Sequence, residues 1–295
     1  MPTATAHLRA AALSTGTLCS DMAWQHWALL AKAGVWGGLT LALPQTAAAS
    51  CPEGVISAQA AHLRTSSEWH EFDAAQRNLV TETGTLSGAE LSISYLCHPW
   101  HWAAALSEQN GSTRYDGQTS SGSQVVSQSV IGQRQGRLQA HYALAEHWQV
   151  GARLLHQTIS RDIASAGGAT GYPELYDWTT LAVGAQWQAS LGPGTLTVAV
   201  WSARPVQSSL LVKLPGRDPT KLPLGSISQF DLNLGWRTQL SPAWHLQAEV
   251  GWHRTEIDAG AQAVITRNGF PTGVAHQPRL TMLSRPIALR LEYGF

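Results

Sequence analysis

The sequence predicts an all-β fold, an antiparallel up-and-down barrel of about ten strands that crosses a membrane. Apolar side chains recur at every second position, in stretches long enough for a tilted strand to cross a bilayer. The connections between these stretches are alternately short and long. The alternating polar side chains are mainly Gln, Asn, Gly, Ser and His, which suit a confined, hydrogen-bonded interior better than a surface in bulk water.

The amino-terminal part resembles a secretory signal peptide. An apolar run over residues 33–43 is preceded by Lys32 and followed by small residues over 47–49. The run is too short for a membrane-spanning helix, which needs about 20 apolar residues. We therefore expect a cleaved signal peptide over residues 1–49, with Met22 as an alternative start and a folded N-terminal helix as the alternative structure.

The barrel is expected over residues 67–295, behind a periplasmic N-terminal segment over 50–66. Strict alternation defines its strands, and the weakest pattern lies in the first hairpin, so eight or twelve strands are the alternatives. The ten expected strands are 67–83, 89–97, 100–110, 124–144, 148–160, 176–191, 195–203, 227–240, 244–257 and 281–295.

The links between these strands separate the two ends of the barrel. Short turns are expected on the periplasmic side and long loops on the outer side. The short links are 97–99, 145–147, 192–194 and 241–243, and the long ones lie near 111–123, 161–175, 204–226 and 258–280.

Aromatic residues are expected to form a girdle at the periplasmic interface. The chain has 13 Trp but only 4 Phe, and a Trp follows three of the four short turns. Trp and Tyr favour the membrane–water interface, because their rings are apolar and carry one polar group. A role in stacking a sugar or a quinone is the alternative. The expected girdle residues are Trp100, Trp148, Trp244, Tyr293 and Phe295.

The last strand alternates apolar and polar residues and ends on an aromatic residue, Phe295. It resembles the terminal strand of Gram-negative outer-membrane β-barrel proteins. The resemblance implies a location in the outer membrane, contact with its lipid, and recognition of this strand by the outer-membrane assembly machinery. Functionally unrelated proteins share this strand, so it implies no substrate. A soluble secreted β-sandwich is the alternative fold.

The inward faces of the strands are expected to carry a network of mixed charge. Both signs occur at similar numbers, which favours mutual neutralisation over a charge-selective pore. A barrel of about ten strands has an interior mostly filled by side chains, which argues against a general diffusion porin. The expected lumen residues are Arg153, Gln186, Gln188, Arg237, Glu249, Arg290 and Glu292.

Asp231 and His253 are the candidate catalytic pair. If the turn over 241–243 closes a simple hairpin, the two residues face each other across neighbouring strands. An Asp can orient a His as a general base. The pair is similar to that of the omptin proteases, which are ten-stranded outer-membrane barrels, although no omptin sequence motif is present. A structural hydrogen bond in the lumen is the alternative.

No cofactor, metal site or nucleic-acid partner is expected. Nineteen Lys and Arg balance 19 Asp and Glu, so the chain has no basic excess to suggest nucleic acid. Cys97, His98 and His101 include metal-ligand types, but residues three apart on a strand point to opposite faces. Cys51 and Cys97 could pair in an oxidising compartment.

The sequence therefore favours a small non-enzymatic outer-membrane barrel, acting as a narrow channel, a surface-binding protein or an accessory subunit of an envelope export complex. The alternative function is an outer-membrane hydrolase, with Asp231 and His253 at the outer mouth.

Overall fold

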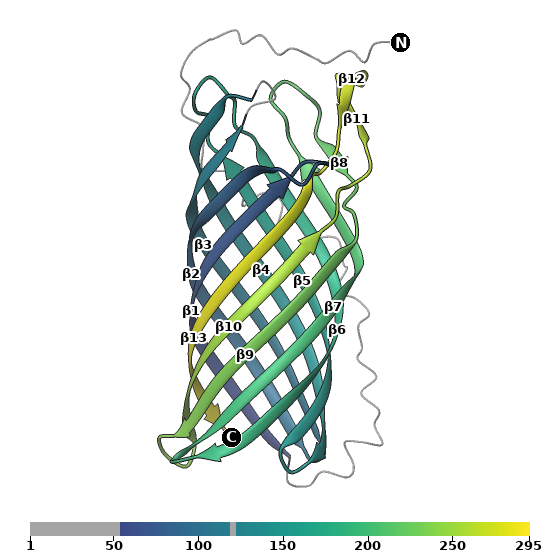
Figure 1. Cartoon of the computed structure of the whole chain (residues 1–295). Helices are drawn as coiled ribbons and strands as arrows, with labels where there is room; N and C mark the ends of the chain where they lie inside the picture. Colours follow the sequence, from purple (N-terminus) through teal and green to yellow (C-terminus); the bar gives the residue numbers. More distant parts are fainter. Residues whose placement is uncertain (1–53, 119–121) are drawn as a thin grey trace. The chain divides into compact units, whose positions relative to one another are not determined.

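The protein is a closed, antiparallel β-barrel of ten strands (Figure 1). A computed structural model describes residues 54–118 and 122–295. No apolar helix of membrane-spanning length occurs among these residues. The expected signal peptide, the alternative start at Met22 and Cys51 lie outside the described ranges.

The strands are numbered along the chain. Ten of them form the barrel wall, the short β8 pairs with the loop-side end of β7, and β11 and β12 pair with each other in a separate sheet. The bounds are β1 (Val55–Phe72), β2 (Asn78–Cys97), β3 (Trp100–Gln118), β4 (Gln124–Ala145), β5 (Trp148–Ile163), β6 (Pro173–Leu191), β7 (Gly194–Val212), β8 (Thr220–Leu222), β9 (Ile227–Gln239), β10 (Trp244–Ile257), β11 (Ala263–Arg267), β12 (Phe270–Ala275) and β13 (Arg279–Gly294).

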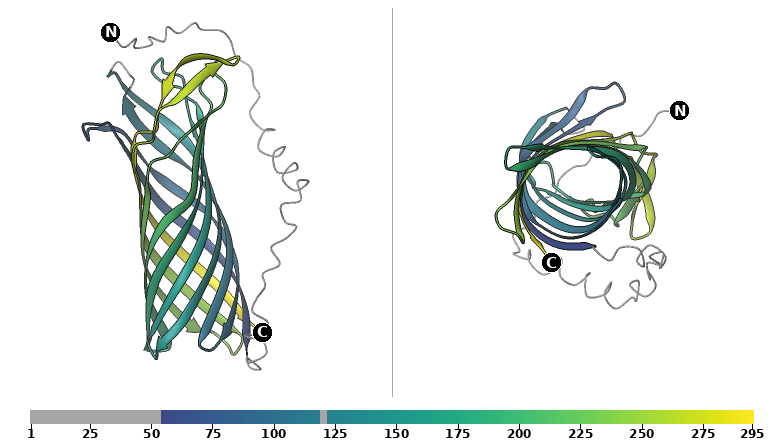
Figure 2. Two further views of the ribbon diagram at one scale, coloured as in Figure 1. Left: turned by 90° about the vertical axis from the view of Figure 1, so that its right-hand side faces the viewer. Right: turned by 90° about the horizontal axis from the view of Figure 1, so that it is seen from below.

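Each wall strand pairs with its neighbours along the chain, and the first wall strand, β1, pairs with the last, β13, to close the ring. Closure removes every open edge from the wall, which a sheet in lipid requires. The short turns gather at one end of the barrel with the carboxyl terminus, and the long connections gather at the other (Figures 1 and 2). All four expected short turns are confirmed.

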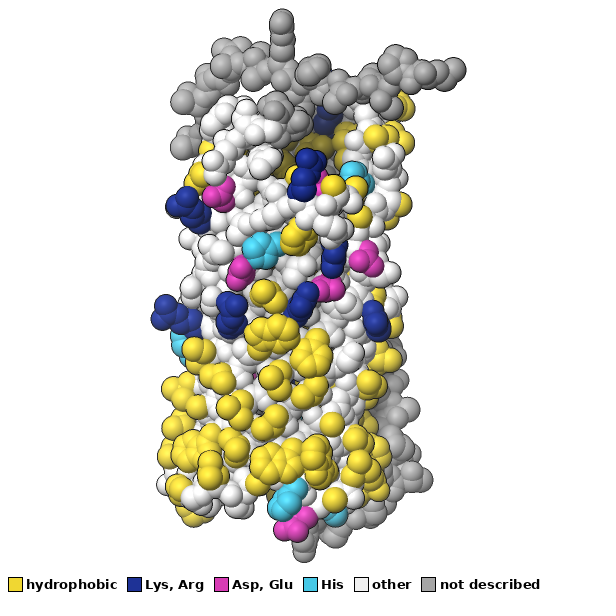
Figure 3. Space-filling view, viewed as in Figure 1, with side chains coloured by type: hydrophobic (Ala, Val, Ile, Leu, Met, Phe, Trp, Pro, Cys, Tyr) yellow, Lys and Arg dark blue, Asp and Glu magenta, His cyan; other side chains and the backbone are white. Residues whose placement is uncertain are grey.

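The outer surface carries an apolar belt in the half nearest the short turns, and charged side chains lie above it (Figure 3). The belt comes from the outward positions of the wall strands, which alternate with lumen positions. An exposed apolar surface of this extent fits the hydrocarbon layer of a membrane. Its members include Leu91, Ile93, Leu106, Leu138, Leu154, Leu181, Val183, Leu232, Leu234, Val250, Ile287, Leu289 and Leu291.

The first hairpin differs from the expectation. β1 begins at Val55 and ends at Phe72, so residues 55–66 form barrel wall and not a periplasmic segment. The expected strand over 67–83 was wrong because it runs through a turn. Asp73 holds that turn, since its Oδ1 accepts hydrogen bonds from the backbone N–H groups of Ala75 (2.8 Å) and Arg77 (2.9 Å).

The long connections are also more ordered than expected. β3 continues to Gln118 and β7 to Val212, and the connection over 258–280 contains the separate β11–β12 hairpin. Asn268 and Gly269 form its two-residue turn, with φ of 52° and 80°. These left-handed angles match the primed turn that Asn-Gly favours.

Candidate functional site

The lumen contains a polar cavity of about 1060 Å³. Residues of the short turns, Glu146 and Pro242 among them, line one end of it, and both are exposed. The cavity therefore opens at the short-turn end of the barrel. Small-molecule sites have volumes of about 300–1,000 Å³, so this lumen is not filled in the way that its strand number predicts.

A layer of packed apolar side chains closes the other end of the cavity. Trp69, Ile159 and Met282 belong both to the cavity lining and to the main core cluster of the barrel. The rest of the cluster lies in the loop-side halves of the strands and on β8. We call this cluster the outer layer; its buried members are Trp69, Leu86, Ile131, Ile159, Tyr176, Trp178, Leu210, Val212, Leu222, Ile227, Ile257, Leu280 and Met282.

Arg161 holds the outer layer together from inside. Its guanidinium, on β5, contacts Glu71 of β1 (2.7 Å), Glu82 of β2 (2.8 Å) and Glu174 of β6 (2.8 Å). Arg161 is 1% exposed and Glu82 is fully buried. Buried charges are stable only when they are paired and hydrogen-bonded, and the neighbouring hydroxyls of Thr113 and Ser129 also donate to Glu82. The ion pairs of Arg161 therefore join β5 to β1 and β2, which are not its neighbours in the sheet.

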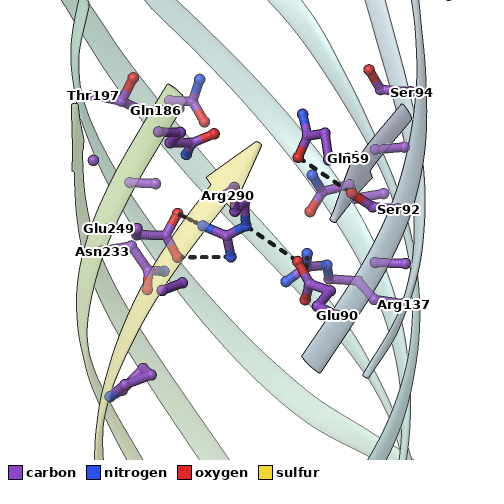
Figure 4. A pocket seen from close by; sticks show the side chains of 18 of the residues that line it. Gln59, Glu90, Ser92, Ser94, Arg137, Gln186, Thr197, Asn233, Glu249 and Arg290 are labelled. Carbon is purple, nitrogen blue, oxygen red and sulfur yellow. Dashed lines mark hydrogen bonds and ion pairs between the residues drawn. The ribbon is translucent and has the colours of Figure 1, made fainter. Parts of the chain in front are cut away.

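Below this layer, ion pairs run around the wall of the cavity. Arg290 lies between Glu249 and Glu90, with N–O distances of 3.2 and 3.3 Å (Figure 4). Arg137 contacts the same Glu90 at 3.2 Å. The row thus extends from β10 to β4.

Small residues on the intervening strands make these pairs possible. Ala61 of β1 stands in register with both Arg290 and Glu90, and Ala105 of β3 stands opposite Arg137. Because a methyl group leaves room above it, the long side chains on either side lean over it and meet.

On the opposite wall, Arg153 of β5 reaches Asp231 of β9, with 3.0 Å between Nη1 and Oδ2. It passes over Ala182, its register partner on β6, and lies 4.0 Å from the ring centroid of Trp201. The indole of Trp201 lies against Gly184, where an added Cβ would be 2.5 Å from the ring. Cation–π contact and the ion pair together fix Arg153.

Asp231 and His253 face each other in register, as expected, but their side chains are not joined. Asp231 is bound by Arg153, whereas Nε2 of His253 is hydrogen-bonded to Oδ1 of Asn233 at 2.9 Å. Both residues line the cavity that opens at the short-turn end. The outer mouth, where a hydrolase of the omptin kind was expected, is thus separated from them by the outer layer.

The structure places the other expected lumen residues along the same cavity. Arg237 also makes an ion pair, with Glu292 at 2.8 Å. Each of the four lumen Arg side chains is matched by an acidic side chain. The expected residues that line the cavity are Arg153, Gln186, Gln188, Arg237, Glu249, Arg290 and Glu292.

The expected girdle residues lie exposed near the short turns. Tyr293 packs edge-on against both Trp244 and Phe295, with ring centroids 4.9 Å apart in each case. Trp100 and Trp148 are 40% and 52% exposed, so their rings face outward. Cys97, at the same end of β2, is disulfide-bonded.

Sequence reasoning missed Arg161, Glu71 and Glu174. Arg161 was assigned to a loop over 161–175, although it continues the inward alternation that starts at Arg153. Extending that alternation would have placed it in the lumen. Nothing in the sequence pairs it with strands β1 and β2, because those contacts cross the barrel.

Comparison with known proteins gives the fold. No protein-family model matches the sequence, and no curated protein matches it. Among solved structures, the chain is similar to the outer membrane protease OmpT from Escherichia coli, with a TM-score of 0.50, 10% identity, and coverage of 82% of this chain and 97% of OmpT. The chain has the fold of the Gram-negative outer-membrane β-barrels.

Two further solved structures match the chain at lower TM-scores. The translocator domain of the autotransporter NalP from Neisseria meningitidis has a TM-score of 0.47 and 13% identity, covering 91% of this chain and 98% of that domain. The toluene transporter TodX from P. putida has a TM-score of 0.30 and 12% identity, covering 84% of this chain and 91% of TodX. Such distant outer-membrane barrels define no common activity.

Proposed function

We propose that the protein is a non-enzymatic barrel of the Gram-negative outer membrane that acts as a narrow channel, closed in this conformation by the outer layer. The observation that carries the proposal is the polar cavity, which extends from the short-turn end to Trp69, Ile159 and Met282. A barrel that served only to display loops would have no need for an open lumen, and side chains could fill it.

A hydrolase is not favoured by this geometry. A general base must reach the proton that it abstracts, and its orienting carboxylate must be free to hold it. Asp231 is held by Arg153 instead, and His253 by Asn233.

The proposal includes the steps that bring the chain to the membrane. A signal peptide over residues 1–49 is cleaved during export, and the last strand, ending at Phe295, is recognised by the assembly machinery. The apolar belt then contacts outer-membrane lipid, with the short turns in the periplasm.

Planar-bilayer conductance tests the channel. Arg161→Gln removes the cation that pairs with three carboxylates, so we expect it to weaken the outer layer and give steady single-channel steps. Wild type should remain closed most of the time under the same voltage. Trp69→Ala removes an indole from the outer layer where that layer borders the cavity. It is a second variant expected to open the channel, in case Arg161→Gln fails to fold.

Arg134→Gln is the matched control, because Arg134 lies on the outer face of β4 and is half-exposed beside Glu108. It should conduct like wild type. If both opening variants fold and neither conducts more than wild type, the lumen is not a conduction path and the proposal is wrong.

A further inference from the structure

One wall of the cavity is lined by amides that the protein itself does not use. Seven Gln side chains on the neighbouring strands β4, β5 and β6 line the cavity. Within residues 54–118 and 122–295, none of them makes a side-chain hydrogen bond, and Oε1 of Gln149 is buried without a partner. They are Gln133, Gln135, Gln139, Gln149, Gln157, Gln186 and Gln188.

Three of the four other glutamines of the cavity, Gln59, Gln109 and Gln229, are hydrogen-bonded to other wall residues, and Gln247 of β10 is the exception within the described part of the chain. Gln109 accepts a hydrogen bond from Thr65 at 2.7 Å, and Gln229 donates to Thr255 at 3.2 Å. The free amides are therefore concentrated on one side, and they face the wall that carries Glu249, Arg290 and neighbouring ion pairs.

A buried histidine adds to the amide wall. His141 of β4 is 4% exposed and lines the cavity, and its Nδ1 has no hydrogen-bond partner. Its ring is held by His101, stacked at 5.8 Å, and by Trp201, edge-on at 5.3 Å. A polar atom that is buried and unbonded is costly unless water or a ligand satisfies it.

Away from its open end, the cavity offers no unpaired charge that could bind an ion, among the residues that the structure describes. Its four arginines pair with four acidic residues: Arg137 with Glu90, Arg153 with Asp231, Arg237 with Glu292, and Arg290 with Glu90 and Glu249. The fifth acidic residue of the lining, Glu146, lies exposed in a short turn at the open end. An entering ion would lose its hydration without gaining a free counter-charge. An uncharged ligand has no such penalty.

We propose that this cavity binds an uncharged ligand rich in hydroxyl or amide groups, such as a short neutral oligosaccharide, with the amide wall of β4–β6 as its binding surface. An amide offers both a donor and an acceptor, which matches groups that are themselves both donor and acceptor. The ligand enters from the short-turn end, where the cavity is open. The inference names a substrate class for the proposed channel, but binding does not require that the channel conduct.

Equilibrium binding to the folded barrel in detergent micelles tests the inference. The probes are maltotriose and maltotrionate, which is the same sugar with its reducing end oxidised to a carboxylate. Isothermal titration calorimetry should show saturable binding of maltotriose and markedly weaker binding of maltotrionate. The double variant Gln135→Leu/Gln186→Leu should bind maltotriose roughly tenfold less tightly, because two hydrogen-bonding amides are lost without a large change of shape.

Gln128→Leu is the matched control, since Gln128 lies on the outward face of the same strand, β4, and is exposed. It should bind maltotriose as wild type does. Absence of saturable binding, equal binding of the two sugars, or unchanged binding by a folded double variant would each overturn the inference. Binding without conductance in the Arg161→Gln barrel would uphold it while contradicting the channel.

Discussion

Arg153 on β5 donates to Asp231 on β9, with 3.0 Å between nitrogen and oxygen and two strands of the wall between them. Because of this contact, Asp231 is not hydrogen-bonded to His253, although the sequence suggested these two residues as a catalytic pair. The carboxylate that faces His253 in the sheet register is directed away from it and braces the barrel.

The stability of variants should reflect that bracing. Asp231→Asn leaves the guanidinium of Arg153 without a charged partner in a largely buried position, so we expect it to lower the free energy of unfolding by about 1–3 kcal/mol. His253→Gln keeps a hydrogen-bonding group beside Asn233 and should cost less than about 1 kcal/mol. Urea titration in micelles, followed by Trp fluorescence, measures both. Equal losses, or a larger loss for His253→Gln, would mean that Asp231 and His253 act as a unit.

Packing of Trp201 gives a second expectation. A methyl group at Gly184 would lie 2.5 Å from both the indole and the carbonyl oxygen of Val200, so Gly184→Ala must displace the wall or the ring. We expect a loss of about 1–3 kcal/mol in the free energy of unfolding, the usual effect of overpacking. Gly235→Ala is the matched control, because the nearest atom to its added methyl is 3.5 Å away. Similar losses for the two variants would contradict the close contact.

The register of the wall was predictable where a tight turn joined two strictly alternating strands. The turn over 241–243 and the alternation on either side placed Asp231 opposite His253, and this register is confirmed. The first hairpin was not predicted correctly, because Asp73 forms its turn through side-chain hydrogen bonds that strand periodicity does not reveal. Contacts that reach across intervening strands, such as Arg153 to Asp231, depend on where a small residue like Ala182 leaves room, and a single sequence does not indicate that.

Asp218 should make the β11–β12 hairpin, which we call the outer hairpin, sensitive to acid. Its carboxylate accepts hydrogen bonds from the backbone N–H of Gly269 (2.9 Å) and Asn268 (3.1 Å) and from Thr266 Oγ1 (2.7 Å), and the first of these contributes most to lowering the pKa of Asp218 below its ordinary value. A lowered pKa means that this stabilisation is complete above the ordinary Asp pKa of about 3.9 and is lost as the pH falls through the lower, folded value.

The amide proton shift of Gly269, followed by NMR as the pH is lowered, reports this loss. We expect a midpoint below about 3.9 in wild type and a flat profile in Asp218→Ala. A midpoint at or above that value would show that the carboxylate does not hold the turn.

The role of the terminal residue can be separated from its packing. Phe295→Ala should reduce the amount of folded barrel in the outer membrane of cells while leaving refolding into micelles unchanged, because the proposed recognition involves the assembly machinery and not the barrel interior. Phe270→Ala is the control, since Phe270 on the outer hairpin is 75% exposed and Phe295 is 76% exposed. Equal assembly of the two variants in cells would remove the terminal residue from the recognition.

Side-selective labelling of the lumen tests most directly whether the cavity is open to the short-turn end and closed to the outside. Ser107 lines the cavity and makes no side-chain hydrogen bond in the described structure, so Ser107→Cys introduces a thiol with little change in shape. Gly273→Cys on the outer hairpin is the control, because nothing lies within 4 Å of the added Cβ. The reagent is a charged, membrane-impermeant maleimide, applied to oriented vesicles from either side. We predict that Ser107→Cys reacts only from the short-turn side and Gly273→Cys only from the loop side. Rapid reaction of Ser107→Cys from the loop side would contradict the closed outer layer on which the proposed function rests.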